Sequence, residues 1–316
     1  MTAGGGLVSA VLLLGALALP MGCSRSPLPS SMEQRLPVLT TVVPMTLLTQ
    51  AVGGNCVVVT QLLPPTADPH DFKARPGDLL ALERSRVLVK NGLGLEAFLP
   101  RLLEASQPRD LVVIEASRGV VPIPDGGDSG DHPPHSDSHH HGADNPHVWL
   151  DPLRAAQQVE AIRDGLVKAD PGCADQYRRN ASRARAQLIQ LDRHIAGVLA
   201  PYRGRTFVTF HAVAPYFAER YGLKAAVLVE TPEQEPAPAD LQRVTSLVRR
   251  NGLGAFLHEP DRRPRSLEAL AKDLGLQVRL FDPLEAIAPD QEPGLSTYLQ
   301  VMRRNAHAVA GVWRRP

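Results

Sequence analysis

The feature that most constrains the fold is one long helical pattern from Cys173 to about Leu199. Its apolar residues recur at steps of three and four, while Arg and Gln fill the opposite face; they are Tyr177, Ala181, Ala184, Leu188, Leu191, Ile195 and Leu199. This spacing places the apolar side chains on one stripe of an α-helix. The pattern contains no proline and only Gly197 near its end, so it predicts an uninterrupted helix that resists bending.

Segments of β type alternate with helical patterns on both sides of this helix. The β-type segments are residues 37–43, 56–63, 87–89 and 111–114 before it, and 206–210, 225–229, 254–257 and 277–281 after it. Helix starts stand between them, at Arg75-Pro76-Gly77-Asp78 and at Asp151-Pro152, where an Asp N-cap precedes Pro at the first helical position. Strands that alternate with helices indicate βαβ units and therefore parallel sheets.

We therefore predict an α/β protein with two lobes, each a mostly parallel sheet flanked by helices, joined by one long rigid linker helix. The length of 316 residues agrees with about two domains. The predicted boundaries are 37–170 for the N-terminal lobe, 171–200 for the linker helix and 201–316 for the C-terminal lobe.

The N-terminal residues indicate export from the cytoplasm. The apolar run Leu7–Leu19 is short for a bilayer core of about 30 Å and suits a signal peptide. It ends in Pro20-Met21-Gly22-Cys23, and a small residue before Cys is similar to a lipoprotein cleavage site. We therefore assign residues 1–23 to a signal peptide, Cys23 to lipidation and residues 24–36 to a tether. An ordinary cleaved signal without lipid is the alternative. Either way the mature protein lies in the periplasm or on the outer face of the cell membrane, and a lipid anchor is its only expected membrane contact.

The composition argues against nucleic-acid partners and draws attention to histidine. A net charge of +1 and an aromatic content of 4% offer neither a basic surface nor base-stacking platforms. Of the 11 histidines, several gather in residues 125–144, which otherwise contain mainly Gly, Asp, Ser and Pro. Such a segment lacks the apolar residues of a core, so we expect a mobile loop. Its histidines predict a secondary, weaker metal site formed by His132, His135, His139, His140 and His141.

Two cysteines remain beside Cys23, namely Cys56 and Cys173. An exported protein can form a disulfide. The spacing alone leaves two possibilities open, a Cys56–Cys173 disulfide or two free buried thiols.

Four residues follow predicted strands at equivalent positions. His70 and His147 come after strands of the first lobe, while His211 and Asp282 directly follow strands of the second. Ligands of open parallel sheets bind outside the carboxyl ends of the strands. If the lobes face each other, three imidazoles and one carboxylate therefore converge in the cleft. Imidazole ligands favour zinc and its transition-metal neighbours, and four protein ligands suit a carrier, because a catalytic zinc keeps one position open for water.

Other histidines are interpreted as ordinary surface or core residues. These are His194 in the long helix, His307 in the last helical pattern, and His258. The segment from His258 to Arg262 has Arg where a zincin motif has its second His. A zinc hydrolase nevertheless remains an alternative, with Glu259 or Asp282 as its acid or base.

The sequence resembles a known family, the cluster A-I metal-binding proteins of ABC importers, which are zinc and manganese solute-binding lipoproteins. Six co-linear motifs from about residue 37 to the C-terminus carry the resemblance: residues 63–70 (LPPTADPH), 91–96 (NGLGLE), 145–152 (NPHVWLDP), 210–223 (FHAVAPYFAERYGL), 232–236 (PEQEP) and 282–284 (DPL). Each motif keeps the family's order along the chain.

The resemblance implies that the chain is not an enzyme but a two-lobed carrier whose cargo is zinc, with an ABC membrane permease as partner. The family's ligand positions map onto His70, His147, His211 and Asp282. Manganese-type members carry a carboxylate at the third position, where this chain has His211, so the zinc type is expected. A carrier of manganese or another divalent metal and a surface adhesin remain the alternatives within the family. We expect a monomer.

Overall fold

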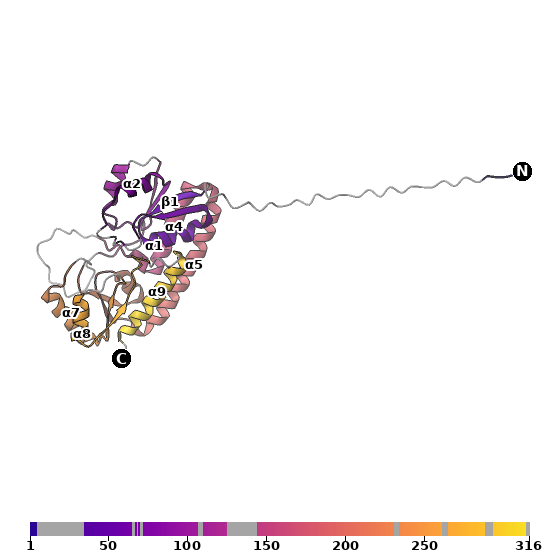
Figure 1. Cartoon of the computed structure of the whole chain (residues 1–316). Coiled ribbons are helices and arrows are strands. Elements are labelled where there is room, and N and C mark those ends of the chain that lie inside the picture. Colours follow the sequence, from indigo (N-terminus) through magenta and orange to yellow (C-terminus); the bar gives the residue numbers. More distant parts are fainter. Residues whose placement is uncertain are drawn as a thin grey trace.

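Figure 1 shows a computed structural model of the chain. The structure describes residues 1–4, 35–64, 67, 69, 72–106, 110–124, 144–230, 234–260, 265–287 and 293–313. The predicted signal core, Cys23, His70 and the five histidines of the 125–144 loop lie outside these ranges. The predicted tether lies outside them up to residue 34, and its last residue, Leu36, already begins the first strand.

The N-terminal lobe is built on a four-stranded parallel sheet in the order β2-β1-β3-β4. Its strands are β1 (Leu36–Thr40), β2 (Val57–Gln61), β3 (Val87–Lys90) and β4 (Val112–Glu115). Its helices are α1 (Val43–Gly53), α2 (Pro76–Glu83), α3 (Leu99–Ser106) and α4 (Pro152–Ala169). The predicted start of α4 is present, because the Asp151 side chain accepts a hydrogen bond from the Leu153 N–H and Pro152 opens the helix.

Helix α1 has no counterpart among the helices predicted from the sequence. Most of its residues are buried, and it packs against the sheet, α4, α5 and α9. A helix that is covered on nearly all sides has no polar face, so the alternation of apolar and polar residues that would reveal it is missing.

The C-terminal lobe has two parallel strand pairs, β5 with β6 and β7 with β8, and β5 lies beside β7. Its strands are β5 (Thr206–Thr209), β6 (Lys224–Val227), β7 (Ala255–His258) and β8 (Gln277–Leu280). Its helices are α6 (Pro215–Tyr221), α7 (Pro238–Asn251), α8 (Arg265–Asp273) and α9 (Leu295–Ala310). The eight strands of the described ranges lie in or within one residue of the segments predicted from the sequence. Short 3₁₀ helices occur at η2 (Gly54–Cys56), η3 (Val148–Leu150), η4 (Pro171–Cys173), η5 (Ala200–Tyr202) and η6 (Gly311–Trp313).

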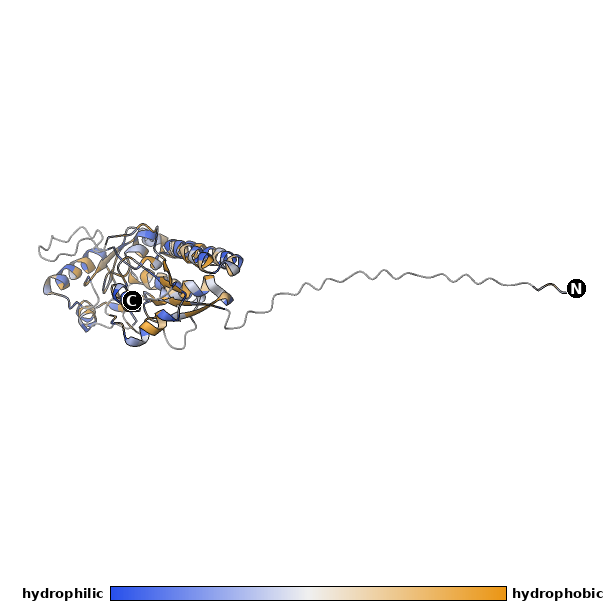
Figure 2. Ribbon diagram, turned by 90° about the horizontal axis from the view of Figure 1, so that it is seen from above, coloured by the Kyte–Doolittle hydropathy of each residue, from blue (hydrophilic) through white to orange (hydrophobic). Residues whose placement is uncertain are grey.

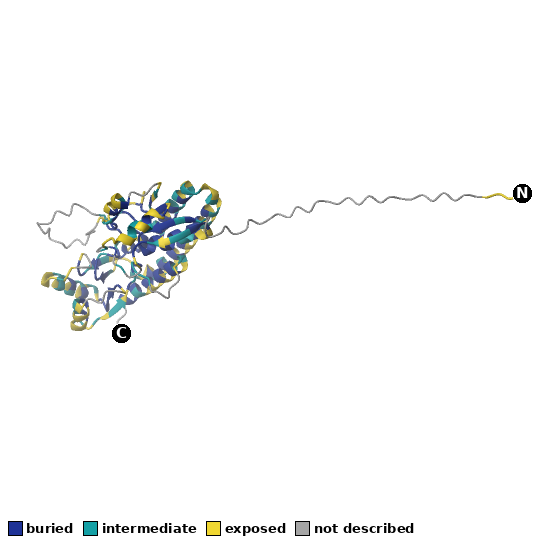
Figure 3. Cartoon of the chain, turned by 45° about the horizontal axis from the view of Figure 1, so that its top comes forward, coloured by how far each residue is buried: buried dark blue, intermediate teal, exposed yellow. Residues whose placement is uncertain are grey.

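Helix α5 (Ala174–Leu199) is the long helix that the sequence predicted. It runs along one side of the molecule past both lobes, with α9 beside it (Figure 1). The apolar stripe is buried at all seven predicted positions, from Tyr177 to Leu199. Hydrophilic residues colour the outer helices in Figure 2, and buried residues concentrate in the strands and the inner faces of the helices in Figure 3.

The two lobes share one apolar core. A continuous cluster of buried side chains includes Val38 and Leu88 of the first sheet, Leu188 of α5, and Phe207 and Phe256 of the second lobe. Among the described residues no helix is both long and apolar enough to cross a membrane. The fold is thus the predicted two-lobed α/β arrangement with a long helix.

Candidate metal centre

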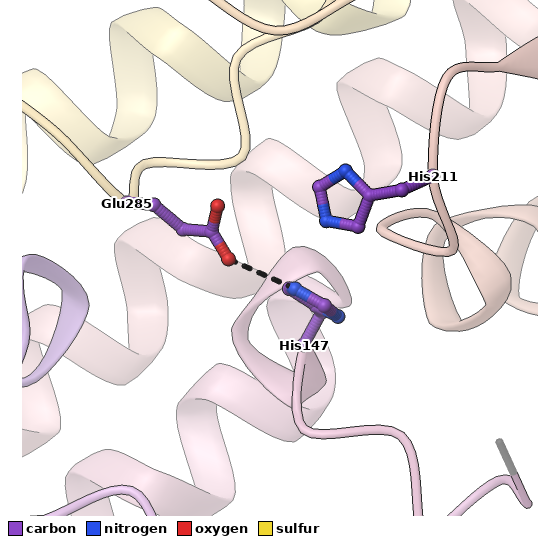
Figure 4. A group of neighbouring side chains, drawn as sticks. All are labelled: His147, His211 and Glu285. Carbon is purple, nitrogen blue, oxygen red and sulfur yellow. Dashed lines mark hydrogen bonds and ion pairs between the residues drawn. The ribbon is translucent and has the colours of Figure 1, made fainter. Parts of the chain in front are cut away.

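Three polar side chains from separate elements converge between the lobes. His147 directly precedes η3 of the first lobe, His211 follows β5 of the second, and Glu285 lies in the loop after β8. Figure 4 shows the two imidazoles and the carboxylate facing one another. Their candidate ligand atoms all lie within 4.8 Å of one another, and the two imidazole rings are 5.7 Å apart between centroids. Both histidine side chains are only 2% exposed and that of Glu285 is 15% exposed, so little of the group is accessible to solvent.

Asn145 fixes the orientation of His147. Its Oδ1 accepts a hydrogen bond from the His147 backbone N–H at 3.1 Å and lies 3.0 Å from the ring Nδ1. An amide oxygen only accepts, so this contact places the ring proton on Nδ1. Nε2 faces Glu285 Oε1 at 2.9 Å, a contact in which this nitrogen also carries a proton, and it is the atom that would bind a metal in place of that proton.

The same asparagine connects the two lobes at the site. Its Nδ2 donates to the carbonyl oxygen of Ala212 at 2.7 Å, and its own carbonyl accepts from the Tyr216 hydroxyl at 2.7 Å. Burial raises the pKa of Tyr216, which keeps its hydroxyl protonated as that donor. Because Ala212 follows His211 directly, one amide side chain sets the positions of both histidines.

A buried carboxylate lies beside His211. Glu259, directly after β7, is 4% exposed, and its Oε1 lies 3.3 Å from His211 Nδ1. The backbone of His211 is held separately, because its carbonyl accepts from Thr209 Oγ1 at 2.7 Å and from the Val213 N–H at 2.8 Å.

The loop that carries Glu285 is held in a tight turn. The Leu284 N–H donates to Asp282 Oδ1 at 2.8 Å, and Leu284 adopts a left-handed φ of 62°. Trp149 Nε1 donates to the Pro283 carbonyl at 2.7 Å, which ties the turn to the segment beside His147. Asn305 of α9 pairs with both the N–H and the carbonyl of Asp282, at 2.9 and 2.7 Å.

The structure brings together two of the four ligands predicted from the sequence. His147 and His211 come together, whereas His70 lies outside the described residues. Asp282 is not a member of the three-residue group found in the described part of the chain; one of its carboxylate oxygens supports the turn that presents Glu285. Sequence reasoning missed Glu285, and its only signal was a carboxylate in the same loop as Asp282-Pro283.

The histidines that were interpreted as ordinary residues make other contacts. His194 of α5 and His307 of α9 are exposed and face each other with ring centroids 6.2 Å apart. His258 Nδ1 lies 2.7 Å from the Glu259 carbonyl. None of the three belongs to the group of His147, His211 and Glu285.

The structure pairs Cys56 and Cys173, which the sequence left open. The disulfide joins η2 of the first lobe to η4, immediately before the start of α5. It therefore fixes the first turn of the long helix to the connection between α1 and β2.

The comparisons with known proteins identify the family and the fold. Residues 38–312 match the family model described as ZnuA, zinc-uptake complex component A, periplasmic. The chain is 29% identical over 279 residues to the zinc-binding lipoprotein AdcA of Streptococcus pneumoniae, covering 88% of this chain and 56% of AdcA. It is 30% identical over 263 residues to the high-affinity zinc uptake system protein ZnuA of Yersinia pestis, covering 78% of this chain and 82% of that protein. The chain thus spans a little over half the length of the streptococcal AdcA relatives.

Solved structures give the same result. A crystal structure of ZnuA superposes with a TM-score of 0.75 at 26% identity, covering 89% of this chain and all of that one. Zn(II)-bound AdcA from Streptococcus pneumoniae superposes with a TM-score of 0.74 at 26% identity, covering 89% of this chain and 58% of AdcA. These matches confirm the resemblance drawn from the six motifs. The chain belongs to the ZnuA family, the periplasmic component A of zinc-uptake complexes.

Proposed function

We propose that this chain is the extracytoplasmic zinc-binding component of an ABC importer, which captures Zn²⁺ between its lobes and delivers it to a membrane permease. The convergence of His147, His211 and Glu285 from three separate elements into one buried group carries the proposal. The names of the relatives, a zinc-binding lipoprotein and a zinc uptake system protein, support it.

The proposed ligands are His70, His147, His211 and Glu285. Three imidazoles with one carboxylate suit the borderline-soft zinc ion, whereas manganese prefers more oxygen ligands. Four protein ligands close the tetrahedral coordination of zinc, which favours a carrier over a hydrolase, since a hydrolase needs a bound water. Asp282, the carboxylate that the sequence suggested, acts in this proposal through the turn it caps.

A matched pair of variants tests which carboxylate binds the ion. Glu285→Gln removes the carboxylate that faces His147, and we expect zinc affinity to fall at least tenfold, equivalent to about 1.4 kcal/mol. Asp282→Asn keeps an oxygen that accepts the Leu284 N–H, so its zinc affinity should stay near that of the wild type. Competition titration with a zinc chelator measures both. The opposite ranking would make Asp282 the ligand.

Growth under zinc limitation tests the transport role. A strain that lacks this protein should grow poorly when zinc is scarce, and the wild-type chain should restore growth. A variant with both His147→Ala and His211→Ala should fail to do so at equal abundance. Full rescue by that double variant would contradict a role for the site in import and would favour an adhesin, which needs no cargo.

The membrane anchor is a separate part of the proposal. Cys23 is the proposed lipidated residue and the permease the proposed partner of a monomeric carrier. Cys23→Ser should release the protein from the membrane fraction and abolish incorporation of a labelled fatty acid. Unchanged membrane association of that variant would contradict lipidation at Cys23.

The histidine-rich segment is proposed to bind further zinc ions loosely. Its composition lacks the apolar residues of a core, so we expect ion binding to cost conformational entropy and its affinity to be below that of the buried site. Deletion of residues 125–143 should remove only the weak equivalents from a zinc titration. The bridge between Pro124 and Asp144 holds the two ends of the segment together, so a short Gly linker suits the deletion. Loss of the tight site would show that the segment supplies a primary ligand.

A further inference from the structure

We propose that Glu259 is a positioning residue for His211, and that its carboxylate supplies a negative charge that a divalent cation needs in this buried site. The inference rests on the zinc-carrier function proposed above. It deepens that function by naming a residue that tunes affinity without binding the ion.

The position of Glu259 follows from the neighbouring strands. β5 and β7 lie side by side and are followed directly by the segments of His211 and Glu259, so both side chains arise at the same edge of the lobe. The Glu259 backbone is fixed from two sides: its carbonyl lies 2.7 Å from His258 Nδ1, and the His258 carbonyl accepts from the Phe281 N–H at 2.8 Å. These contacts fix the backbone position from which the Glu259 side chain extends beside the imidazole.

Burial makes this carboxylate unusual. Glu259 is 4% exposed, its Oε1 lies 3.3 Å from His211 Nδ1, and its Oε2 is buried without a hydrogen-bond partner among the described residues. An ionised carboxylate without compensation is strongly destabilising in a protein interior. A compensating positive charge close to His211 would remove that penalty, and a metal on the other ring nitrogen provides one.

The first consequence concerns the tautomer of His211. Glu259 Oε1 lies 3.3 Å from Nδ1, so a proton on that nitrogen would face the carboxylate and Nε2 would keep its lone pair for the metal. Asn145 does the same for His147 with a neutral amide oxygen. The two histidines thus receive the same orientation from two chemically different acceptors.

The second consequence concerns charge. Neutral imidazoles and the single carboxylate of Glu285 leave a bound Zn²⁺ with one uncompensated positive charge. Glu259 brings the sum over the buried group to zero, which lowers the electrostatic penalty of transferring the ion from water. The arrangement therefore favours a divalent ion over a monovalent one.

Two substitutions separate these effects. Glu259→Gln keeps an oxygen that can accept the Nδ1 proton but removes the charge, whereas Glu259→Ala removes both. We expect Glu259→Gln to weaken zinc binding about tenfold and Glu259→Ala up to about a hundredfold, the range for residues that orient metal ligands. Glu268→Gln, at an exposed position of α8, is the matched control and should bind zinc as the wild type does.

NMR of the histidine ring nitrogens supplies a readout that a merely structural role would not change. In metal-free protein at neutral pH, His211 should carry its proton on Nδ1 in the wild type and in Glu259→Gln. It should populate both tautomers in Glu259→Ala. If Glu259→Ala does not fold, the affinity of Glu259→Gln still tests the charge.

Two results would overturn the proposal: wild-type zinc affinity in Glu259→Gln, or an unchanged His211 tautomer in folded Glu259→Ala. Failure of the carrier function would be recognised separately. In that case the wild type itself would lack a tight zinc site, while the tautomer measurement, which uses no metal, would still report on Glu259.

Discussion

At the scale of single residues, Asn145 has the largest set of consequences for the site. Its side chain orients His147 and also binds the Ala212 carbonyl next to His211. Asn91 supports it from the other side by donating to the Pro146 carbonyl at 3.0 Å. The motifs 91–96 and 145–152 are therefore one connected structure beside the metal centre.

Asn145→Ala should weaken zinc binding about ten- to a hundredfold, because the His147 ring would lose its acceptor and the segment after His211 would lose its hydrogen bond to the first lobe. Asn145→Asp keeps the acceptor for His147 but loses the donor to Ala212, so its affinity should be intermediate. Chelator competition with the two variants measures the difference. Equal affinity of wild type and Asn145→Ala would show that the histidines are oriented without this amide.

Glu96 is a buried carboxylate that shapes the loop after β3. It accepts hydrogen bonds from Thr41 Oγ1 at 2.7 Å and from the N–H groups of Asn91 and Gly92 at 2.7 and 3.0 Å. Burial nevertheless raises the pKa of Glu96, and these hydrogen bonds offset the effect only in part. The folded protein therefore holds this proton more tightly than the unfolded chain does.

The raised pKa of Glu96 makes the stability of the folded protein depend on pH. As the pH rises from below the ordinary glutamate value through the raised pKa of Glu96, the wild type loses stability, because the unfolded chain ionises first. Glu96→Gln has no ionisable group at this position. Its unfolding free energy should therefore rise relative to that of the wild type as the pH increases through the raised pKa of Glu96. Urea unfolding of metal-free protein at a series of pH values measures it. A constant difference would contradict the raised pKa.

At the scale of elements, the disulfide ties the start of the long helix to the first lobe. Cys56 and Cys173 are 117 residues apart, so the bond closes a long loop of the unfolded chain. In the chain-entropy description a loop of about 100 residues corresponds to about 4.7 kcal/mol, and removal of a native disulfide typically destabilises by about 2–5 kcal/mol.

A double Cys56→Ser and Cys173→Ser variant should unfold at a lower denaturant concentration, with a loss of about 2–5 kcal/mol in unfolding free energy. Treatment of the wild type with reductant should reproduce the loss, while the same reductant should leave the double variant unchanged. An unfolding curve of the double variant that coincides with the wild type would show that α5 is held by packing alone.

At the scale of the whole molecule, the lobes are not independent units. One apolar core runs through both, α5 contacts α1, α4, α6 and α9, and α9 of the second lobe returns to pack on α1 of the first. The proposed metal ligands come from both lobes, so a bound ion would add a bridge between parts that are already joined. We therefore expect zinc to stabilise the whole fold in one transition.

Zinc should raise the unfolding free energy by about 2.7 kcal/mol when its free concentration is a hundredfold above the dissociation constant. The effect should fade as the solution is acidified across about pH 8 to 5, because histidines must be neutral to bind a metal. Thermal unfolding with a buffered zinc series measures this, and His211→Ala should respond far less. A melting temperature that ignores zinc at neutral pH would contradict the site.

The sequence by itself determined the architecture. The helical stripe of α5 appears directly in its apolar spacing, and the β-branched segments mark the strands, because local periodicity reports which face of an element is buried. Helix α1 was not predicted, because nearly complete burial removes the alternation of apolar and polar residues that marks a helix. His147 and His211 could be predicted as neighbours once the carboxyl ends of the strands in the two lobes were assumed to face each other.

Only the tertiary structure decided which other groups surround them. Glu285, Glu259 and Asn145 reach the histidines from loops whose paths depend on turns, such as the one at Leu284, and on contacts such as Trp149 to Pro283. The pairing of Cys56 with Cys173 likewise depends on how α5 docks on the first lobe. Distances between side chains far apart in the chain are set by packing of the elements, and no local pattern of residues encodes them.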